Sequence, residues 1–494
     1  MSVTNTYSLV EEIIVPEKAR QRGGNPSGIE LSSFGKDATT SSTVVHESSV
    51  NNLLSANIVG TTVNNNNNNN NTTTSSDSES TSRVYQEDSE VFPEGGLTAW
   101  RVVLGSFFGL IAVLGFINSI GAVQAYISSH QLESMSESQI SWIFSVFIFL
   151  GYVLSGFAGP VFDAFGPYHL TILGTGFFIV GIMMVSLSTT YYQFFLSLGV
   201  CSGIGLGMLM TPMVAIVGHW FNYKRGTALG AATIGGSLGG VIFPLILRSL
   251  YASVGFAWAI RVVGFLCLFV LTLAIVLMKP RLERTDFQFK FENIIDFKSL
   301  SDWRFVWLTL ANFLGELAVV NGVTFLTSYA LRQGKTETLS YTLLTLLNTM
   351  GMLGRWLPGV VADRVGRFNT LIFICIMAFI TIFAIWLPFG HSTAGLIVFS
   401  ILHGFCNGAV LSLAPVCCGQ ICKARDYGKR YGTMFFFTSF GVLLGVPLSG
   451  ALIKSGPNGY NNLIIFTGSL YIGTTIFLVL SRYCMVGVKV LAKV

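Results

Sequence analysis

Charge is scarce in this sequence. Lys, Arg, Asp and Glu together make up 11% of the 494 residues, whereas 51% are hydrophobic and the mean hydropathy is +0.63. A soluble chain of this length would need far more charge to cover its surface. The net charge of +5 is spread between loops, so we expect no nucleic-acid partner. The composition excludes a soluble globular protein and predicts a chain surrounded by the lipid bilayer.

Cysteine is also scarce, and its placement suits neither disulfides nor metal binding. Most of the eight cysteines, such as Cys201, Cys267, Cys375, Cys406 and Cys484, fall within apolar runs, where they are expected to act as small apolar residues. Cys417, Cys418 and Cys422 lie close together but have no histidine nearby, so we prefer packing over a metal site. We expect no cofactor. The chain does not open with a basic segment followed by an apolar one, so no cleaved signal peptide is predicted.

The first 92 residues lack apolar periodicity. They are rich in Ser, Thr and Asn and include eight consecutive Asn residues over 64–71. Such a segment cannot bury enough apolar surface to offset the entropy of folding, so the sequence predicts a disordered cytoplasmic tail over 1–92. Its acidic, Ser-rich part at 75–90 is either a solvated spacer, which we prefer, or a phosphorylation target.

Long apolar runs fill the rest of the chain. Each has about 20 or more residues, enough for a helix to cross a hydrocarbon core of ~30 Å. The longest interior break separates six runs from six. The sequence therefore predicts an all-α membrane protein with twelve transmembrane helices in two six-helix bundles, at 93–278 and 303–494, joined by a cytoplasmic linker at 279–302. The runs are 100–127, 138–160, 168–189, 192–219, 226–251, 257–278, 303–330, 339–361, 368–388, 394–418, 431–453 and 461–484.

One octapeptide pattern occurs twice, 200 residues apart. Residues 159–166 read GPVFDAFG and residues 359–366 read GVVADRVG, after the second predicted helix of each set. Matched turns in two equal halves are typical of a transporter built from two repeats. The aspartate of each copy can cap the N-terminus of a neighbouring helix or pair with a basic side chain across the bundles. The alternative is an ordinary cytoplasmic turn, held on that side of the membrane by the positive-inside preference of its basic residues.

Basic residues predict the orientation. The breaks on the side of the octapeptides hold fourteen Lys and Arg residues and the opposite breaks hold five, which predicts a cytoplasmic location for the octapeptides and both termini. The fourteen are Lys224, Arg225, Lys279, Arg281, Arg284, Lys290, Lys298, Arg304, Arg364, Arg367, Lys423, Arg425, Lys429 and Arg430; the five are Arg248, Arg261, Arg332, Lys335 and Lys454.

Three stretches resemble a known family. GVVADRVGR after the eighth run is similar to the pattern of the major facilitator superfamily, while PEGGLTAW and HWFNYKRGTALGAATIGG resemble fungal members of its monocarboxylate porter family. The likeness runs from about Phe92 to the end. It implies a conformational lock, which is weaker in the first copy because Ala164 and Pro167 replace basic residues. The lock residues are Gly159, Asp163, Gly166, Gly359, Asp363, Arg364, Gly366 and Arg367.

Polar residues within the apolar runs are the substrate-binding candidates, since charge is expensive there. Glu316 lies about 18 Å along the seventh helix from Arg304, near the membrane midplane, and shares a face with Asn312. Arg355 lies about 12 Å from Asp363 along the eighth helix and suits a carboxylate or another planar acceptor. The alternatives are a protonated Glu316 bonded to a neighbouring helix, and an Arg355 that snorkels or pairs with an acid.

The resemblance also implies what this chain has lost. In the monocarboxylate porters a helix-8 Arg, an Asp one turn before it and a helix-1 Lys handle the proton and the carboxylate. Arg355 matches that Arg, but Gly351 and Asn118 replace the other two. Asn118 instead suits a neutral polar group. Further candidates by depth are Asn321, Asn348, His403 and Asn407, although we expect His403 to bond to a neighbouring helix.

The resemblance implies a monomeric carrier of a small organic solute that works by alternating access about a midplane site. Its fungal branch includes riboflavin uptake carriers, and the loss of acid-coupling groups favours riboflavin over small organic acids. A nutrient sensor that uses the tail as its output is the alternative of a different class. We expect no enzyme activity, because no nucleophile and base can be paired. The expected location is the plasma membrane, with the vacuolar membrane as the alternative.

Overall fold

The computed structural model describes residues 92–281, 296–454, 456, 458–489 and 492–493, and these residues form helices and connecting turns with no strand. Residues 1–91 of the predicted tail, and residues 282–295 of the predicted linker, lie outside this part of the chain. The first six membrane helices are α1 (Leu97–Ser129), α2 (Glu137–Phe165), α3 (Pro167–Val185), α4 with α5 (Tyr191–Phe194 and Gly203–Gly218, joined by a wider helical stretch over Phe195–Ser202), α6 (Arg225–Ser253) and α7 (Gly255–Leu277).

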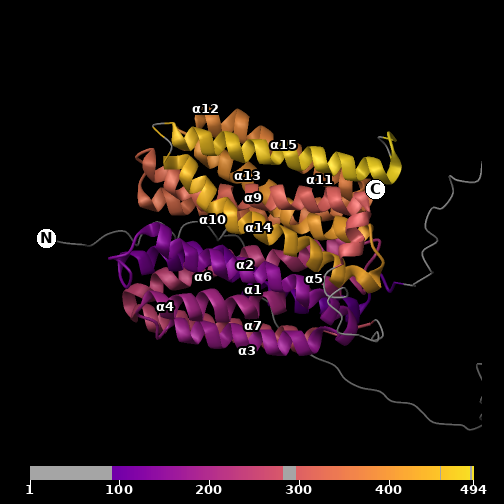
Figure 1. Ribbon diagram of the computed structural model, residues 1–494, viewed down its shortest axis with the longest axis horizontal. Coiled ribbons are helices and arrows are strands. Elements are labelled where there is room, and N and C mark those ends of the chain that lie inside the picture. Colours follow the sequence, from indigo (N-terminus) through magenta and orange to yellow (C-terminus); the bar gives the residue numbers. More distant parts are fainter. Residues whose placement is uncertain (1–91, 282–295, 455, 457, 490–491, 494) are drawn as a thin grey trace, which may run out of the picture. The chain divides into compact units, whose positions relative to one another are not determined.

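Six further membrane helices follow the short turn Phe297–Ser301. They are α9 (Trp303–Arg332), α10 (Glu337–Val365), α11 with α12 (Arg367–Thr381 and Leu387–Phe389, joined through Ile382–Trp386), α13 (Thr393–Gln420), α14 (Tyr427–Lys454) and α15 (Gly459–Val486). Another short turn, Ala424–Asp426, precedes α14. In Figure 1 the helices from α1 to α7 lie together, as do those from α9 to α15.

Each predicted apolar run corresponds to one of these helices. Eleven of the described helices are long and apolar enough to cross a membrane; α10 falls outside that group. Its polar residues, which include Asn348, Thr349 and Arg355, lower its apolar character. The predicted ends of the second and eighth runs come too early, because α2 continues to Phe165 and α10 to Val365. The octapeptides are therefore the last two turns of a helix, and only Gly166 and Gly366 make the bend into the next one.

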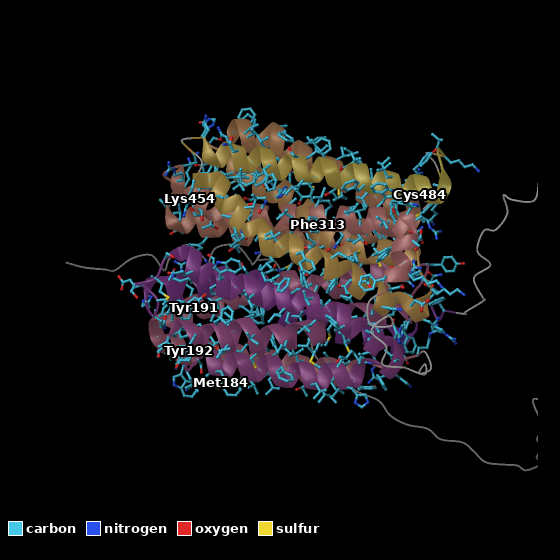
Figure 2. The ribbon with its side chains drawn as sticks, viewed as in Figure 1. Met184, Tyr191, Tyr192, Phe313, Lys454 and Cys484 are labelled. Carbon is cyan, nitrogen blue, oxygen red and sulfur yellow. The ribbon has the colours of Figure 1, made fainter. Side chains whose placement is uncertain are left out.

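Large apolar side chains cover the outer faces of the helices. Met184 at the end of α3 is 51% exposed and Tyr192 in α4 is 62% exposed. Both lie at the edge of the first bundle in Figure 2. Apolar surface of this kind would be unfavourable in water but is the expected covering of a helix in lipid.

The two bundles meet along two pairs of helices. α2 of the first bundle packs against α14 of the second, and α6 of the first packs against α10 of the second. Gly159 lies against Gly428 in the first pair, and Gly359 lies against Gly226 in the second. A Cβ added at Gly159 would come within 2.2 Å of the Gly428 carbonyl oxygen, and one at Gly359 within 2.3 Å of the Gly226 oxygen. Small residues therefore allow the helix backbones to touch. We call the ends of the bundles that carry these contacts the octapeptide end.

Candidate functional site

Asp363 caps a helix of the other bundle. One carboxylate oxygen accepts the backbone N–H of Gly226 at 2.9 Å, and the other accepts the N–H of Thr227 at 2.7 Å and its hydroxyl at 2.7 Å. Gly226 and Thr227 are the second and third residues of α6, whose own N-cap residue, Lys224, provides no capping bond. An acidic side chain is favourable at this position because the first turn of a helix has unpaired N–H groups and partial positive charge. Asp363 supplies the missing cap from α10.

Asp163 makes the equivalent contact in the other direction. Its carboxylate accepts the backbone N–H groups of Gly428 at 3.1 Å and Lys429 at 2.7 Å, which are the second and third residues of α14. The duplicated pattern in the sequence thus produces a duplicated contact in space. In each case, the aspartate at the end of one helix caps the start of a helix in the opposite bundle.

The glycines of the two octapeptides do different work. Gly166 and Gly366 have positive φ angles of 78° and 118°, which side chains disfavour, so these two glycines allow the tight bend. Gly159 and Gly359 lie inside helices and provide the close approach between bundles described above. The pattern therefore combines a contact, a cap and a bend within eight residues.

The basic residues in and next to the second octapeptide have different surroundings. Arg367 donates to the carbonyl oxygen of Asn222, just before α6. Arg364 is exposed and has no hydrogen-bond partner among the described residues. A third arginine, Arg225 at the start of α6, reaches the Gly419 carbonyl at the end of α13 and lies over the ring of Tyr427, 5.3 Å from its centre. The charged contacts around the second copy thus involve α6, α11 and α13.

His219, at the end of α5, is buried at the same end of the molecule. Its burial, together with the charges of Arg281 and Arg225, lowers its pKa to about 3. Its ring packs at 5.2 Å from that of Phe162 in α2. The imidazole is therefore neutral at physiological pH and adds no charge to this end.

Glu316 and Arg355 bring opposite charges into the interior between the bundles. Both are buried, with exposures of 5% and 2%, and they interact electrostatically across the space between α9 and α10. Arg355 Nε donates to the Ser237 hydroxyl in α6 at 2.8 Å, while its Nη1 has no partner among the residues that the structure describes. The Glu316 carboxyl makes no hydrogen bond to a described residue, and no direct ion pair joins the two. The pair therefore retains unused capacity for hydrogen bonding.

Aromatic side chains lie near this pair. Tyr152 in α2 is buried and lies within electrostatic range of both charges. Its ring packs edge to face on that of Phe435 in α14, with 5.1 Å between the ring centres. The ring centres of Phe435 and Tyr431 are 4.7 Å apart. Flat ligands stack on such rings. We call Tyr152, Ser237, Glu316, Arg355, Tyr431 and Phe435 together the seam site.

Three predicted asparagines form bonds between helices of one bundle. Asn118 in α1 donates to the Gly236 carbonyl in α6 at 3.1 Å. Asn312 donates to the Thr438 hydroxyl at 2.9 Å, and Asn321 accepts from the Ser449 hydroxyl at 2.8 Å, both between α9 and α14. Two of them adjoin the seam site, because Asn118 bonds to the residue before Ser237 and Asn312 lies one helical turn from Glu316. The bonds of Asn312 and Asn321 hold the second bundle together.

A second polar group lies inside the second bundle. His403 Nδ1 lies 3.3 Å from the Thr381 hydroxyl in α11, and its ring stacks on Phe399 at 4.7 Å. Asn407 accepts from the Tyr471 hydroxyl at 2.7 Å, and Tyr471 is within electrostatic range of Glu316. Within the described part of the chain, His403 Nε2 and the amide nitrogens of Asn407 and Asn321 are buried without a hydrogen-bond partner. Asn348 is buried on α10, seven residues from Arg355.

Sequence reasoning missed Tyr152, Ser237 and Tyr431 as members of the seam site. An uncharged aromatic or serine in an apolar run carries no sign of the face it occupies, so only the packing of α2, α6 and α14 identifies them. The weak signal that was available is the position of Tyr152 and Tyr431 on the two helices that adjoin the octapeptide contacts.

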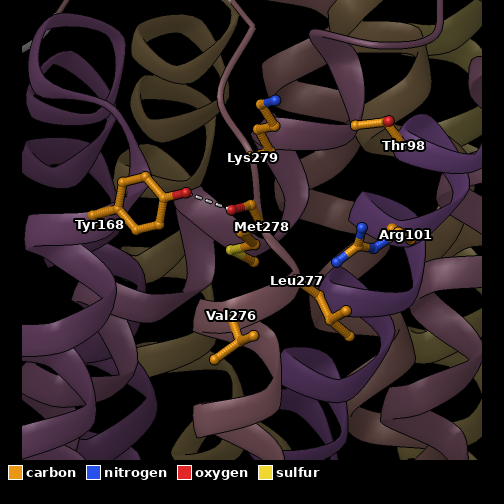
Figure 3. Close-up of a pocket in the computed structure, with 7 residues that line it drawn as sticks. All are labelled: Thr98, Arg101, Tyr168, Val276, Leu277, Met278 and Lys279. Carbon is orange, nitrogen blue, oxygen red and sulfur yellow. Dashed lines mark hydrogen bonds between the residues drawn. The ribbon is translucent and has the colours of Figure 1, made fainter.

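A surface pocket lies elsewhere. Its volume is about 240 Å³, and it opens between the start of α1, the start of α3 and the end of α7. The Tyr168 hydroxyl donates to the Met278 carbonyl at 2.7 Å beside it (Figure 3). It contains none of the predicted site residues. The lining residues are Thr98, Arg101, Tyr168, Val276, Leu277, Met278 and Lys279.

Sequence comparisons give consistent matches. The family model described as Major Facilitator Superfamily matches residues 102–394, and one described as MFS_1 like family matches residues 318–489. The chain is 40% identical to the riboflavin transporter MCH5 of Saccharomyces cerevisiae, over 82% of this chain and 81% of that protein. It is 36% identical to the MFS transporter asaE of Aspergillus flavus, over 83% of this chain and 92% of that protein. It is 33% identical to the aspyridones efflux protein apdF of Emericella nidulans, over 78% of this chain and 77% of that protein.

Solved structures give the same picture of the fold. The human organic anion transporter MFSD10 superposes with a TM-score of 0.65 at 17% identity, over 77% of this chain and 99% of that one. The transporter FucP in its outward conformation superposes with a TM-score of 0.61 at 19% identity, over 78% of this chain and 99% of that one. At these identities the likeness concerns the arrangement of helices alone.

Proposed function

Because the chain belongs to the major facilitator superfamily, we propose that it carries riboflavin, or a similar neutral planar solute, across its membrane by alternating access. That it is a multi-pass membrane transporter follows from the family and from the helices described above. The relative named a riboflavin transporter supports the choice of solute. Other relatives are named as efflux transporters, so the direction of transport is part of the proposal.

The seam site is the observation that carries this proposal. A flavin has a flat three-ring system whose edge bears an N–H between two carbonyl groups. Tyr152, Tyr431 and Phe435 offer rings for stacking, Glu316 offers an acceptor for the N–H, and Arg355 offers a donor for a carbonyl. We assign Asn118, Asn348 and the polar group around His403 and Asn407 to the borders of this site. Asn312 and Asn321 then act through the packing of α9 on α14.

The octapeptides act as the conformational lock in this proposal. The caps at Asp163 and Asp363 hold the bundles together at the octapeptide end, and alternating access requires both to release. The excess of basic residues at that end supports a cytoplasmic location for it, with both termini on the same side. The conformation would then be closed to the cytoplasm. We propose the plasma membrane as its location.

Uptake measurements test the substrate. Cells without their own carriers would express the chain and receive labelled riboflavin or a panel of monocarboxylates at two external pH values. We expect saturable riboflavin uptake. Acid-driven pyruvate or lactate accumulation without riboflavin uptake would instead support the second candidate, an organic-acid carrier, which the unpartnered Arg355 Nη1 favours because guanidinium groups bind carboxylates.

Substitutions test the site. The Glu316→Gln, Arg355→Ala double variant should lower riboflavin uptake at least about tenfold, because hydrogen bonds to charged groups contribute about 1.5–3 kcal/mol. Glu133→Gln with Arg332→Ala provides a matched control that removes the same two charges from exposed positions. Retained uptake in the double variant, at equal amounts of protein in the membrane, would refute the assignment of the seam site.

A further inference from the structure

Glu94 lies just before α1, in the PEGG stretch that the proposed function leaves without a role. Its carboxylate accepts three consecutive backbone N–H groups: Asn222 and Tyr223 at 2.7 Å each on one oxygen, and Lys224 at 3.0 Å on the other. Its own N–H donates to the Trp220 carbonyl at 3.2 Å. The side chain therefore fastens the beginning of α1 to the connection between α5 and α6.

These three N–H groups lie just before those that Asp363 caps, with Arg225 between the two sets. Going along the chain, Asn222, Tyr223 and Lys224 bond to Glu94, whereas Gly226 and Thr227 bond to Asp363. Two carboxylates thus share the start of α6. One belongs to the same bundle as α6, and the other belongs to the opposite bundle.

The backbone at Glu94 supports a specific role for this contact. Glu94 has a φ of 51° and is the one non-glycine residue with positive φ in the described part of the chain. Such a conformation costs free energy and persists where surrounding contacts fix it. The three bonds from the carboxylate and the bond from the amide are contacts of this kind, and Gly95 and Gly96 next to it also have positive φ.

We infer that Glu94 is a positioning residue for the lock between the bundles: it keeps the first turn of α6 in the shape that Asp363 recognises. The inference rests on the proposed alternating-access transport. When the bundles separate at the octapeptide end, Asp363 leaves with α10, and the start of α6 loses that cap. Glu94 stays with its own bundle and keeps the preceding N–H groups ordered, so the turn is ready for Asp363 when the bundles close again.

Hydrogen exchange of the full-length protein in lipid nanodiscs tests this without a substrate. The peptide to follow covers residues 220–230, in the parent chain and in Glu94→Ala and Glu94→Gln. We expect Glu94→Ala to speed exchange about tenfold at residues 222–224 and several-fold at Gly226 and Thr227, which Glu94 does not contact. Glu94→Gln should have a smaller effect, because its side-chain amide oxygen can still accept hydrogen bonds from the N–H groups of Asn222 and Tyr223. Glu133→Gln, an exposed carboxylate removed at the opposite end, should change neither.

Faster exchange confined to residues 222–224 would overturn the inference, since Glu94 would then be a local cap only. Unchanged hydrogen-exchange protection of α11 shows that a variant is folded. If Glu94→Ala loses this protection, Glu94→Gln is compared with the parent chain instead. A Glu94→Ala, Asp363→Ala double variant should affect Gly226 and Thr227 less than the sum of the single changes, because both act on one turn. Absence of riboflavin uptake in the parent chain would sink the proposed substrate and leave this result untouched.

Discussion

At the scale of single residues, Asp163 and Asp363 occupy the same place in the two copies but are not equivalent. Each aspartate accepts two backbone N–H groups at the start of a helix in the opposite bundle, Asp363 those of Gly226 and Thr227 and Asp163 those of Gly428 and Lys429. Arg367 adds a second contact beside Asp363. The first copy has Ala164 and Pro167 where the family pattern has basic residues. The lock should therefore depend more on the second copy.

We expect Asp363→Ala to impair riboflavin uptake more than Asp163→Ala does. Loss of a helix cap costs about 0.5–2 kcal/mol, which shifts an equilibrium between closed and open states by about 2-fold to 30-fold. Initial uptake rates at equal amounts of protein in the membrane measure the difference, with Glu133→Gln as the control. Equal loss in the two variants would contradict the asymmetry.

Residue chemistry also decides how much of the candidate site was predictable. Glu316 and Arg355 could be chosen from sequence because a charge within an apolar helix is rare and expensive. Tyr152 and Ser237 could not, because neither is unusual in a membrane helix. Their role depends on α2 and α6 facing the second bundle, which no local pattern encodes.

At the scale of helices, the starts of α6 and α14 follow one plan. Each start is capped by an aspartate of the opposite bundle. Each also contacts an acidic residue that precedes the first helix of its own bundle. For α6 that acid is Glu94; for α14 it is Asp296, which lies 3.8 Å from Lys429 Nζ and 3.8 Å from Arg430 Nε.

Asp302, the N-cap of α9, belongs to the same region. Burial would raise its pKa, but hydrogen bonds and charge from Arg304, with the charge of Arg430, outweigh burial and hold the pKa below its usual value. Such a carboxylate stabilises the fold above the unfolded-state pKa of about 3.9, and this contribution is lost as the pH falls through the lower folded-state value.

We therefore expect Asp302→Asn to lower the thermal unfolding temperature at pH 7 and pH 5, with the difference from the parent chain shrinking towards pH 3. The contribution should be a few tenths to about 1 kcal/mol, since the group is partly exposed to solvent. Thermal unfolding in detergent at the three pH values measures it. A difference of the same size at pH 3 would show that packing, and not charge, is responsible.

At the scale of the whole molecule, the question is whether the bundles carry a solute or report on one. The twelve long helices, the seam site and the paired caps all lie within residues 92–493. A carrier needs only this part of the chain, whereas a sensor would need an output segment outside the membrane.

Deletion of residues 1–90 should leave riboflavin uptake within about twofold of the parent chain, because it keeps Glu94 and every described contact. Deletion of residues 1–96 provides the contrast, since it also removes Glu94 and should reduce uptake. The measurement is initial uptake rate at matched membrane abundance. The sensor would be favoured if the parent chain signals normally without taking up riboflavin, and if removal of residues 1–90 abolishes that signalling.

The sequence by itself determined the number of membrane helices, their division into two sets of six, the family and the position of the duplicated octapeptide. These features are local, because hydropathy and the spacing of Gly and Asp act within a single segment. Only the tertiary structure decided which helix start each aspartate caps, that Gly159 and Gly359 are contact positions, that Tyr152 lies near Glu316 and Arg355, and that Tyr431 lies near Glu316. The physical reason is that these are contacts between segments more than 100 residues apart, and their partners are backbone groups and aromatic rings that carry no signature in the sequence.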